Sequence, residues 1–152
     1  MELKRIGVND CEKLWKMQVE AFSELLEKYQ DYDISPANEP MSRVEERLRQ
    51  SFTYYYFIMD GETVVGAIRV VDMKDGSRKR ISPIFIMKQF RGKGYAQQAI
   101  RAVEELHGRE NWALGTILQE DGNCCLYEKM GYRQTGETEV INERMTIVNY
   151  AK

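Results

Sequence analysis

The chain has 152 residues, of which 43% are hydrophobic, so it can bury one sizeable core, and we expect a single domain over residues 1–152. Twenty-two Lys and Arg residues against 24 Asp and Glu residues give a net charge of −2, which offers no general attraction for nucleic acid. No run approaches the roughly 20 apolar residues of a membrane span. Cys11, Cys124 and Cys125 form neither a disulfide framework nor a metal-ligand spacing, so we expect a cytoplasmic protein without a metal.

The first third of the chain predicts a strand and two helices. Residues 3–8 form the strand, and Asn9 with Glu12 resembles a capping box at the start of a long helix. That helix has a wide apolar face that includes Trp15, Val19 and Phe22. Residues 30–40 are rich in turn formers, and Ser42 with Glu45 would cap a second, short helix.

The remaining elements alternate between strands and helices. Strands over residues 53–59 and 63–73 are joined by Asp60-Gly61, which indicates a hairpin, and Asp75-Gly76 turns the chain again. An apolar strand over residues 81–87 precedes a glycine-containing loop and an amphipathic helix. A strand over 112–119, a short helix near 124–130 and strands over 132–138 and 144–150 complete the chain.

The loop between the apolar strand and the amphipathic helix resembles a phosphate-binding site. Gly92 and Gly94 allow positive φ and close approach of a ligand, and the N-terminus of the following helix attracts anions. Arg91 and Lys93 would add positive charge. An ordinary tight turn with two solvated cations explains the same residues. The segment is not a Walker loop, which needs four residues between its glycines and a Lys-Ser or Lys-Thr pair after the second. It is not a dinucleotide fingerprint either, because Gln97 stands where a third small residue is needed.

Two motifs in the correct order resemble the GNAT superfamily of acyl-coenzyme A-dependent N-acyltransferases. The stretch from Gln89 to Gly94 resembles the Gln/Arg-x-x-Gly-x-Gly/Ala signature of that family. Downstream, Asn123, Tyr127 and the pair Gly131-Tyr132 match its next element. The resemblance implies an α/β fold: a mixed central sheet, splayed in its middle, with helices on both faces and acetyl-CoA bound in the gap.

The resemblance also implies which residues contact the cofactor. The main chain at Ile86, Met87 and Lys88 would bind the pantetheine arm. The loop residues Gln89, Arg91, Gly92, Lys93, Gly94, Tyr95 and Ala96 would hold the pyrophosphate. Asn123 could contact the cofactor, cap the short helix, or do both.

Transfer of an acyl group to an amine requires a base for the amine and a proton donor for the departing thiolate. By family position, Tyr127 would supply that proton; the alternative is a tyrosine that only packs its ring on the core. Glu120 is the first candidate for the base, ahead of Asp121 and Glu20, although all three could be surface charges. His107 lies at the far end of its helix, where we expect it to be solvated.

The sequence gives the least information about the acceptor of the acyl group. Six carboxylates lie in the first helix and in the connection to the second: Glu20, Glu24, Glu27, Asp31, Asp33 and Glu39. Together they favour a cationic amine, such as a polyamine, although an ordinary solvated helix face would explain several of them. Tyr54 and Tyr56 could line the cleft. The chain is expected to be an N-acetyltransferase for a small-molecule or peptide amine, with a non-catalytic acyl-CoA-binding module as the alternative. The final strands could pair in a homodimer.

Overall fold

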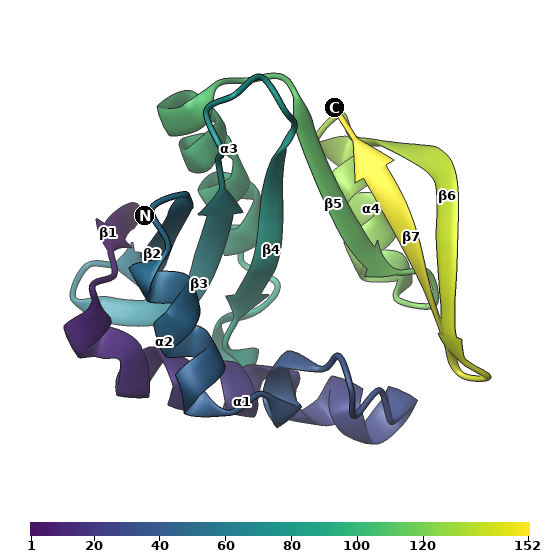
Figure 1. Ribbon diagram of the computed structural model, residues 1–152, viewed down its shortest axis with the longest axis horizontal. Coiled ribbons are helices and arrows are strands. Elements are labelled where there is room, and N and C mark those ends of the chain that lie inside the picture. The colour runs from purple at the N-terminus through teal and green to yellow at the C-terminus, as the bar shows by residue number, and fades with distance from the viewer.

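The computed structural model describes residues 1–152 as one seven-stranded mixed sheet with four α-helices (Figure 1). The strands lie in the order β1 (Glu2–Arg5), β2 (Thr53–Asp60), β3 (Thr63–Val71), β4 (Lys79–Ile86), β5 (Trp112–Ile117), β7 (Met145–Ala151) and β6 (Arg133–Asn142). The helices are α1 (Cys11–Tyr29), α2 (Met41–Arg49), α3 (Tyr95–His107) and α4 (Asp121–Lys129).

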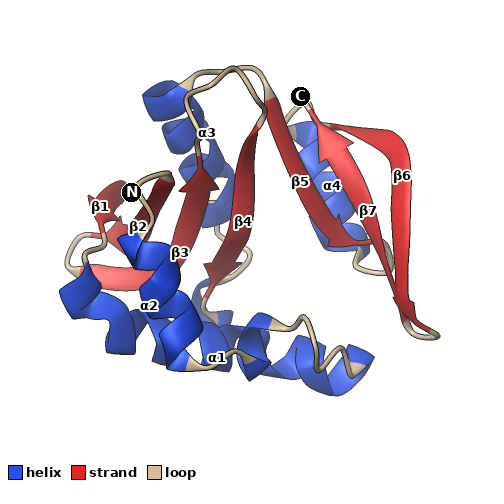
Figure 2. Ribbon diagram, in the orientation of Figure 1, coloured by secondary structure: helices blue, strands red, loops and turns tan.

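Helices cover both faces of the sheet, as the sequence predicted (Figure 2). Helices α1 and α2 share one buried apolar cluster with the sheet, and α3 and α4 share the other. Strand β2 contributes to both clusters because successive side chains on a strand point to opposite faces. Tyr55 therefore packs on the α1 side and Tyr56 on the α3 side.

The sheet opens in its middle, between β4 and β5. These two strands are parallel and pair only at Lys79 with Trp112 and at Arg80 with Ala113, after which they diverge (Figure 1). On its other side, β4 remains paired with β3, and Met87 donates its amide to the carbonyl of Val65 at 2.8 Å. Because hydrogen bonds alternate along an antiparallel pair, the main chain of Ile86 points away from β3 and into the opening.

Both expected capping boxes are wrong. Asn9 lies in a turn of 3-10 helix, and α1 begins after Asp10, whose carboxylate accepts a hydrogen bond from the Gly7 amide at 3.2 Å. Helix α2 follows Pro40 and has no side-chain cap. In both places, turn hydrogen bonds already use amides of the first turn, such as that from Arg43 to the Pro40 carbonyl.

The connection between α1 and α2 is fixed by polar contacts centred on Glu39. Its carboxylate accepts two hydrogen bonds from Arg47, both at 2.7 Å, and one from the buried Gln18 at 2.9 Å. Its carbonyl accepts from the Trp15 indole at 2.8 Å. Glu39 therefore stabilises the fold and is not available to a substrate.

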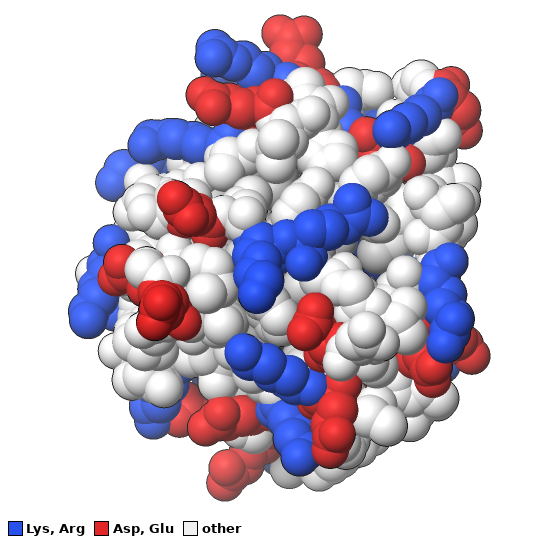
Figure 3. Space-filling view, turned by 90° about the vertical axis from the view of Figure 1, so that its left-hand side faces the viewer, with Lys and Arg blue, Asp and Glu red and all other residues white.

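None of the four helices combines the length and the apolar character needed to cross a membrane. Seen from the β1 edge of the sheet, basic and acidic side chains are interspersed and form no large area of one sign (Figure 3).

Candidate functional site

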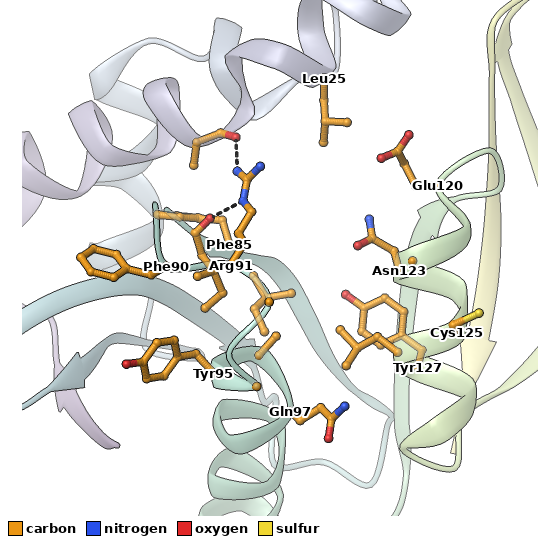
Figure 4. Close-up of a pocket in the computed structure, with 18 of the residues that line it drawn as sticks. Leu25, Phe85, Phe90, Arg91, Tyr95, Gln97, Glu120, Asn123, Cys125 and Tyr127 are labelled. Carbon is orange, nitrogen blue, oxygen red and sulfur yellow. Dashed lines mark hydrogen bonds between the residues drawn. The ribbon is translucent and has the colours of Figure 1, made fainter. Parts of the chain in front are cut away.

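A cavity of about 790 Å³ occupies the opening between the two halves of the sheet (Figure 4). Its walls come from the second half of α1, the end of β4, the loop before α3, and α4. Apolar side chains form much of its lining: Phe22, Leu25, Ile84, Phe85, Ile86 and Leu126. Polar and charged groups also border it, among them Arg91, Glu120 and Asn123, so the cavity suits a ligand with both apolar and polar parts.

The glycine-containing loop has the geometry of an anion site. Gly92 and Gly94 adopt φ values of 77° and 84°, and a Cβ at Gly92 would point into open space. Gly94 precedes α3, which has neither a side-chain cap nor an acidic residue in its first turn. The first amides of α3 are therefore free to donate to an anion. Gly92, Gly94, Tyr95 and Ala96 all border the cavity.

The two cations of this loop, Arg91 and Lys93, lie differently. The Arg91 guanidinium folds back, so that Nε donates to the Ile86 carbonyl at 2.8 Å and Nη2 to the Ala21 carbonyl at 3.0 Å (Figure 4). Lys93 does not line the cavity, and its ammonium lies 5.9 Å from the centre of the Phe90 ring. Arg91 thus joins α1 to the end of β4.

The three residues from Met87 to Gln89 lie behind the main cavity. They border a smaller pocket of about 200 Å³ against α1, because a 3-10 turn at Lys88–Phe90 takes the chain away from the opening. The amide of Met87 already donates to the carbonyl of Val65, so it is not free to bind the pantetheine arm. Lys88 forms an ion pair with Glu24. The amide of Ile86, opposite Gly66, faces the opening.

Tyr127 packs on the core and also borders the cavity. Its ring is buried against Tyr132 and Tyr150, with both pairs of ring centres 6.1 Å apart. Its hydroxyl nevertheless points into the cavity (Figure 4). Burial raises the pKa of Tyr127 to about 12, so the phenol keeps its proton at neutral pH.

Asn123 does not cap α4. The helix begins at Asp121 after Glu120, and the Asn123 amide already donates to the Glu120 carbonyl at 3.0 Å. The Asn123 side chain lies on the cavity wall above Tyr127 (Figure 4). The neighbouring Cys124 packs inward with Sγ 3.8 Å from the Ile117 carbonyl, which agrees with a structural role.

Glu120 lies on the cavity wall near the last turn of α1. Its Oε2 accepts hydrogen bonds from the Tyr29 hydroxyl and from Lys28 Nζ, the latter at 2.7 Å. Burial alone would raise the pKa of this carboxyl, but the hydrogen bonds from Lys28 and Tyr29 outweigh it and hold the pKa below its ordinary value. Glu120 is therefore ionised and is a weak base.

Lys28 and Gln97 also border the cavity but were not predicted as site residues. Lys28 reads in the sequence as one more charged residue on an amphipathic helix. Its contact with Glu120 spans 92 residues, and no local pattern signals it.

His107 and the predicted cleft tyrosines lie away from the cavity. The His107 side chain is only 7% exposed, with Nε2 at 3.0 Å from the Tyr56 hydroxyl and Nδ1 at 3.1 Å from Asp72. Tyr54 packs on the same imidazole ring at 4.8 Å between ring centres. The expectations of a solvated His107 and of a cleft lined by Tyr54 and Tyr56 are both wrong, because the end of α3 packs over β2.

Comparison with known proteins decides the family. The family model described as an acetyltransferase (GNAT) domain matches residues 20–152. This chain belongs to the GNAT acetyltransferase family. GNAT acetyltransferases use acetyl-CoA as the acyl donor, and the match to this family covers all but the first 19 residues of the chain.

Similar proteins differ in the acceptors that their names give. The chain is 30% identical over 89 residues to an N-acetylaspartate synthetase from Danio rerio, a match that covers 57% of this chain and only 31% of the longer relative. The spermidine N-acetyltransferase of Vibrio cholerae, solved with CoA and spermine, is 15% identical, with a TM-score of 0.75 over 98% of this chain and 92% of that one. A Salmonella typhimurium acetyltransferase that modifies the N-terminal serine of ribosomal protein L7/L12 is 11% identical, with a TM-score of 0.75 over 99% and 92% of the two chains.

The GNAT cavity fits acetyl-CoA. The free amides at the start of α3 suit the pyrophosphate, and the apolar walls at Ile84 and Ile86 suit the pantetheine arm. The amide of Ile86 faces the opening left by β5, where an extended arm can pair with it as an added strand would. The Tyr127 hydroxyl lies across the cavity from β4 (Figure 4).

Proposed function

We propose that this protein transfers the acetyl group of acetyl-CoA directly to a primary amine of a small molecule or peptide. The observation that carries the proposal is a neutral, cavity-facing phenol, Tyr127, beside a cavity that also presents an ionised carboxylate, Glu120. A module that only binds acyl-CoA would need neither group.

Acetyl-CoA, when bound, supplies a thioester whose carbonyl carbon is electrophilic. In the transfer, the new N–C bond forms, the C–S bond breaks, and the sulfur leaves with the electron pair. We assign Tyr127 to the sulfur, where its hydroxyl donates a hydrogen bond. The raised pKa of Tyr127 lies above that of a thiol, ~8.5, so full transfer of the phenol proton to the sulfur would be uphill. Stabilisation of the thiolate by a hydrogen bond is therefore the main contribution of the phenol.

The amine must lose a proton, because a free alkylamine has a pKa near 10.4. We assign Glu120 to the amine: its carboxylate holds the ammonium, and its side chain is 24% exposed, which gives the proton a path to water. Its lowered pKa argues against Glu120 as a final proton acceptor. The proton passes through this carboxylate to solvent.

The Tyr127→Phe variant tests the proposal. We expect kcat, followed by release of free CoA thiol over a panel of amines, to fall about 100-fold, because one hydrogen-bond donor in the transition state is removed. Calorimetric CoA binding should stay within about twofold, since the ring and its packing remain. Unchanged turnover would rule out the assigned role of Tyr127. Tight CoA binding by the wild type without turnover on any amine would favour the non-catalytic module.

A further inference from the structure

Where α1 faces α4, the cavity wall carries two opposite charges side by side, Lys28 and Glu120; we call this part the acceptor end of the cavity. Lys28 Nζ lies 2.7 Å from Glu120 Oε2, and both residues border the cavity. Tyr29 holds the same carboxylate oxygen through its hydroxyl, and the Lys28 ammonium lies 5.1 Å from the centre of the Tyr29 ring. The last turn of α1 thus places one cation beside one anion where α1 faces the start of α4.

Both charged groups keep hydrogen-bonding capacity for a ligand. The bonds from Lys28 and Tyr29 end on Oε2 of Glu120, which leaves Oε1 to accept from an ammonium. An ammonium has three N–H donors, and the bond to Glu120 uses one of those on Lys28. The Lys28 side chain is 59% exposed, so its remaining donors can reach a ligand.

Three of the carboxylates that could attract a polycation are already paired or buried. Glu39 is paired with Arg47, and Glu24 is paired with Lys88. Asp31 is buried, and burial raises the pKa of its carboxyl. Around the whole cavity, two carboxylates face three cations: Glu24 and Glu120 against Lys28, Arg91 and Lys129.

We infer that the acceptor is a zwitterion, an α-amino acid or a compound with an amine and a carboxylate at similar spacing. Its amine binds Oε1 of Glu120, and its carboxylate binds Nζ of Lys28. In this arrangement both charges of the acceptor and those of Glu120 and Lys28 have a partner of opposite sign. An amine without a carboxylate would instead place a second positive charge beside Lys28. The inference rests on the proposed acetyl transfer and names its substrate class.

Pairs of acceptors test the inference. Each of several α-amino acids is compared with its own carboxamide, which keeps the side chain and the amine but lacks the carboxylate. An amide also changes the pKa of the neighbouring amine, so the quantity to follow is how the acid-to-amide ratio of kcat/KM changes between variants. In Lys28→Met we expect this ratio to fall about 10- to 100-fold, through KM for the acids, because a charge-assisted hydrogen bond is lost. Lys28→Arg should retain the preference, and Lys16→Met, an exposed cation on the same helix, should leave it unchanged.

Three outcomes would count against the inference. An equal ratio in wild type and Lys28→Met, with unaltered thermal unfolding, would show that Lys28 only braces Glu120. Transfer by the wild type to amides and simple amines alone would reject the zwitterion and leave the acetyl transfer standing. Failure of every acid and every amine, with CoA bound, would reject the proposed function as well.

Discussion

Burial determines the role of His107. The sequence places this residue at the exposed end of an amphipathic helix, yet its side chain is 7% exposed. A neutral ring that donates from Nδ1 to Asp72 leaves Nε2 to accept from the Tyr56 hydroxyl. Burial lowers the pKa of His107 and outweighs the opposing attraction of Asp72. The folded protein therefore keeps this ring neutral at neutral pH.

The lowered pKa of His107 predicts acid sensitivity. The unfolded chain protonates this residue near pH 6.5, whereas the folded chain does so only at lower pH. The unfolded state thus binds more protons as the pH falls below about 6.5, so the stability contributed by the neutral ring is full above that pH and decreases below it. Urea unfolding at pH 7.5 and 5.5 measures the loss. Because His107 is the only histidine, His107→Gln should flatten this dependence while costing about 1 kcal/mol at pH 7.5 from lost hydrogen bonds. An equal pH dependence in both proteins would contradict the prediction.

At the scale of elements, sequence patterns predicted those features that depend on neighbouring residues alone. The strand, the loop with Gly92 and Gly94, and the following helix were recognisable because backbone conformation and apolar periodicity are local properties. Contacts between elements that are distant in the sequence could not be recognised in this way. The pairing of Lys28 with Glu120 and the burial of His107 under β2 depend on how helices lie on the sheet, which no spacing in the sequence encodes. Asn123 was placed correctly near the site, but its capping role was wrong because α4 begins two residues earlier.

Close packing between β3 and β4 supports the cavity wall at one glycine. Gly66 lies opposite Ile86, and a Cβ at this position would stand 2.1 Å from the carbonyl oxygen of Phe85. The two strands can approach this closely only because Gly66 has no side chain. Strand β4 carries one wall of the cavity, so its position depends on this contact.

Gly66→Ala should push β4 away from β3. We expect a loss of about 2 kcal/mol in the free energy of unfolding, typical of overpacking, and weaker CoA binding because Ile84 and Ile86 move with the strand. Urea unfolding and calorimetry measure the two effects. Gly7→Ala is the matched control, since Gly7 has φ of −102° and no atom within 4 Å of its added Cβ. Equal stability of the two variants would show that β4 tolerates the displacement.

At the scale of the whole molecule, α1 spans the opening and touches both halves of the sheet. Arg91 attaches its middle to the end of β4 through the carbonyls of Ala21 and Ile86. On the other half, Asn142 donates to the Tyr29 carbonyl at 2.9 Å, and Glu120 accepts from the Tyr29 hydroxyl. Beyond the two residue pairs that join β4 to β5, these contacts help to fix the width of the cavity.

The contact made by Arg91 predicts that this residue acts on CoA through geometry and not mainly through charge. Replacing it with Met removes both bonds to carbonyls, so we expect CoA affinity to fall about tenfold. At a CoA concentration 100 times the wild-type Kd, CoA should stabilise the wild type by about 2.7 kcal/mol and the variant by about 1.4 kcal/mol. Thermal unfolding of each protein with and without CoA measures these two stabilisations.

Arg91→Lys separates the two roles, because lysine keeps the charge but cannot donate from a planar guanidinium to two carbonyls at once. If the contact between α1 and β4 is what matters, Arg91→Lys behaves like Arg91→Met. If instead the Arg91→Lys variant binds CoA as tightly as the wild type does, the charge of residue 91 acts on the phosphates directly. In that case, the contacts of α1 at Tyr29 and on the sheet hold the helix in place.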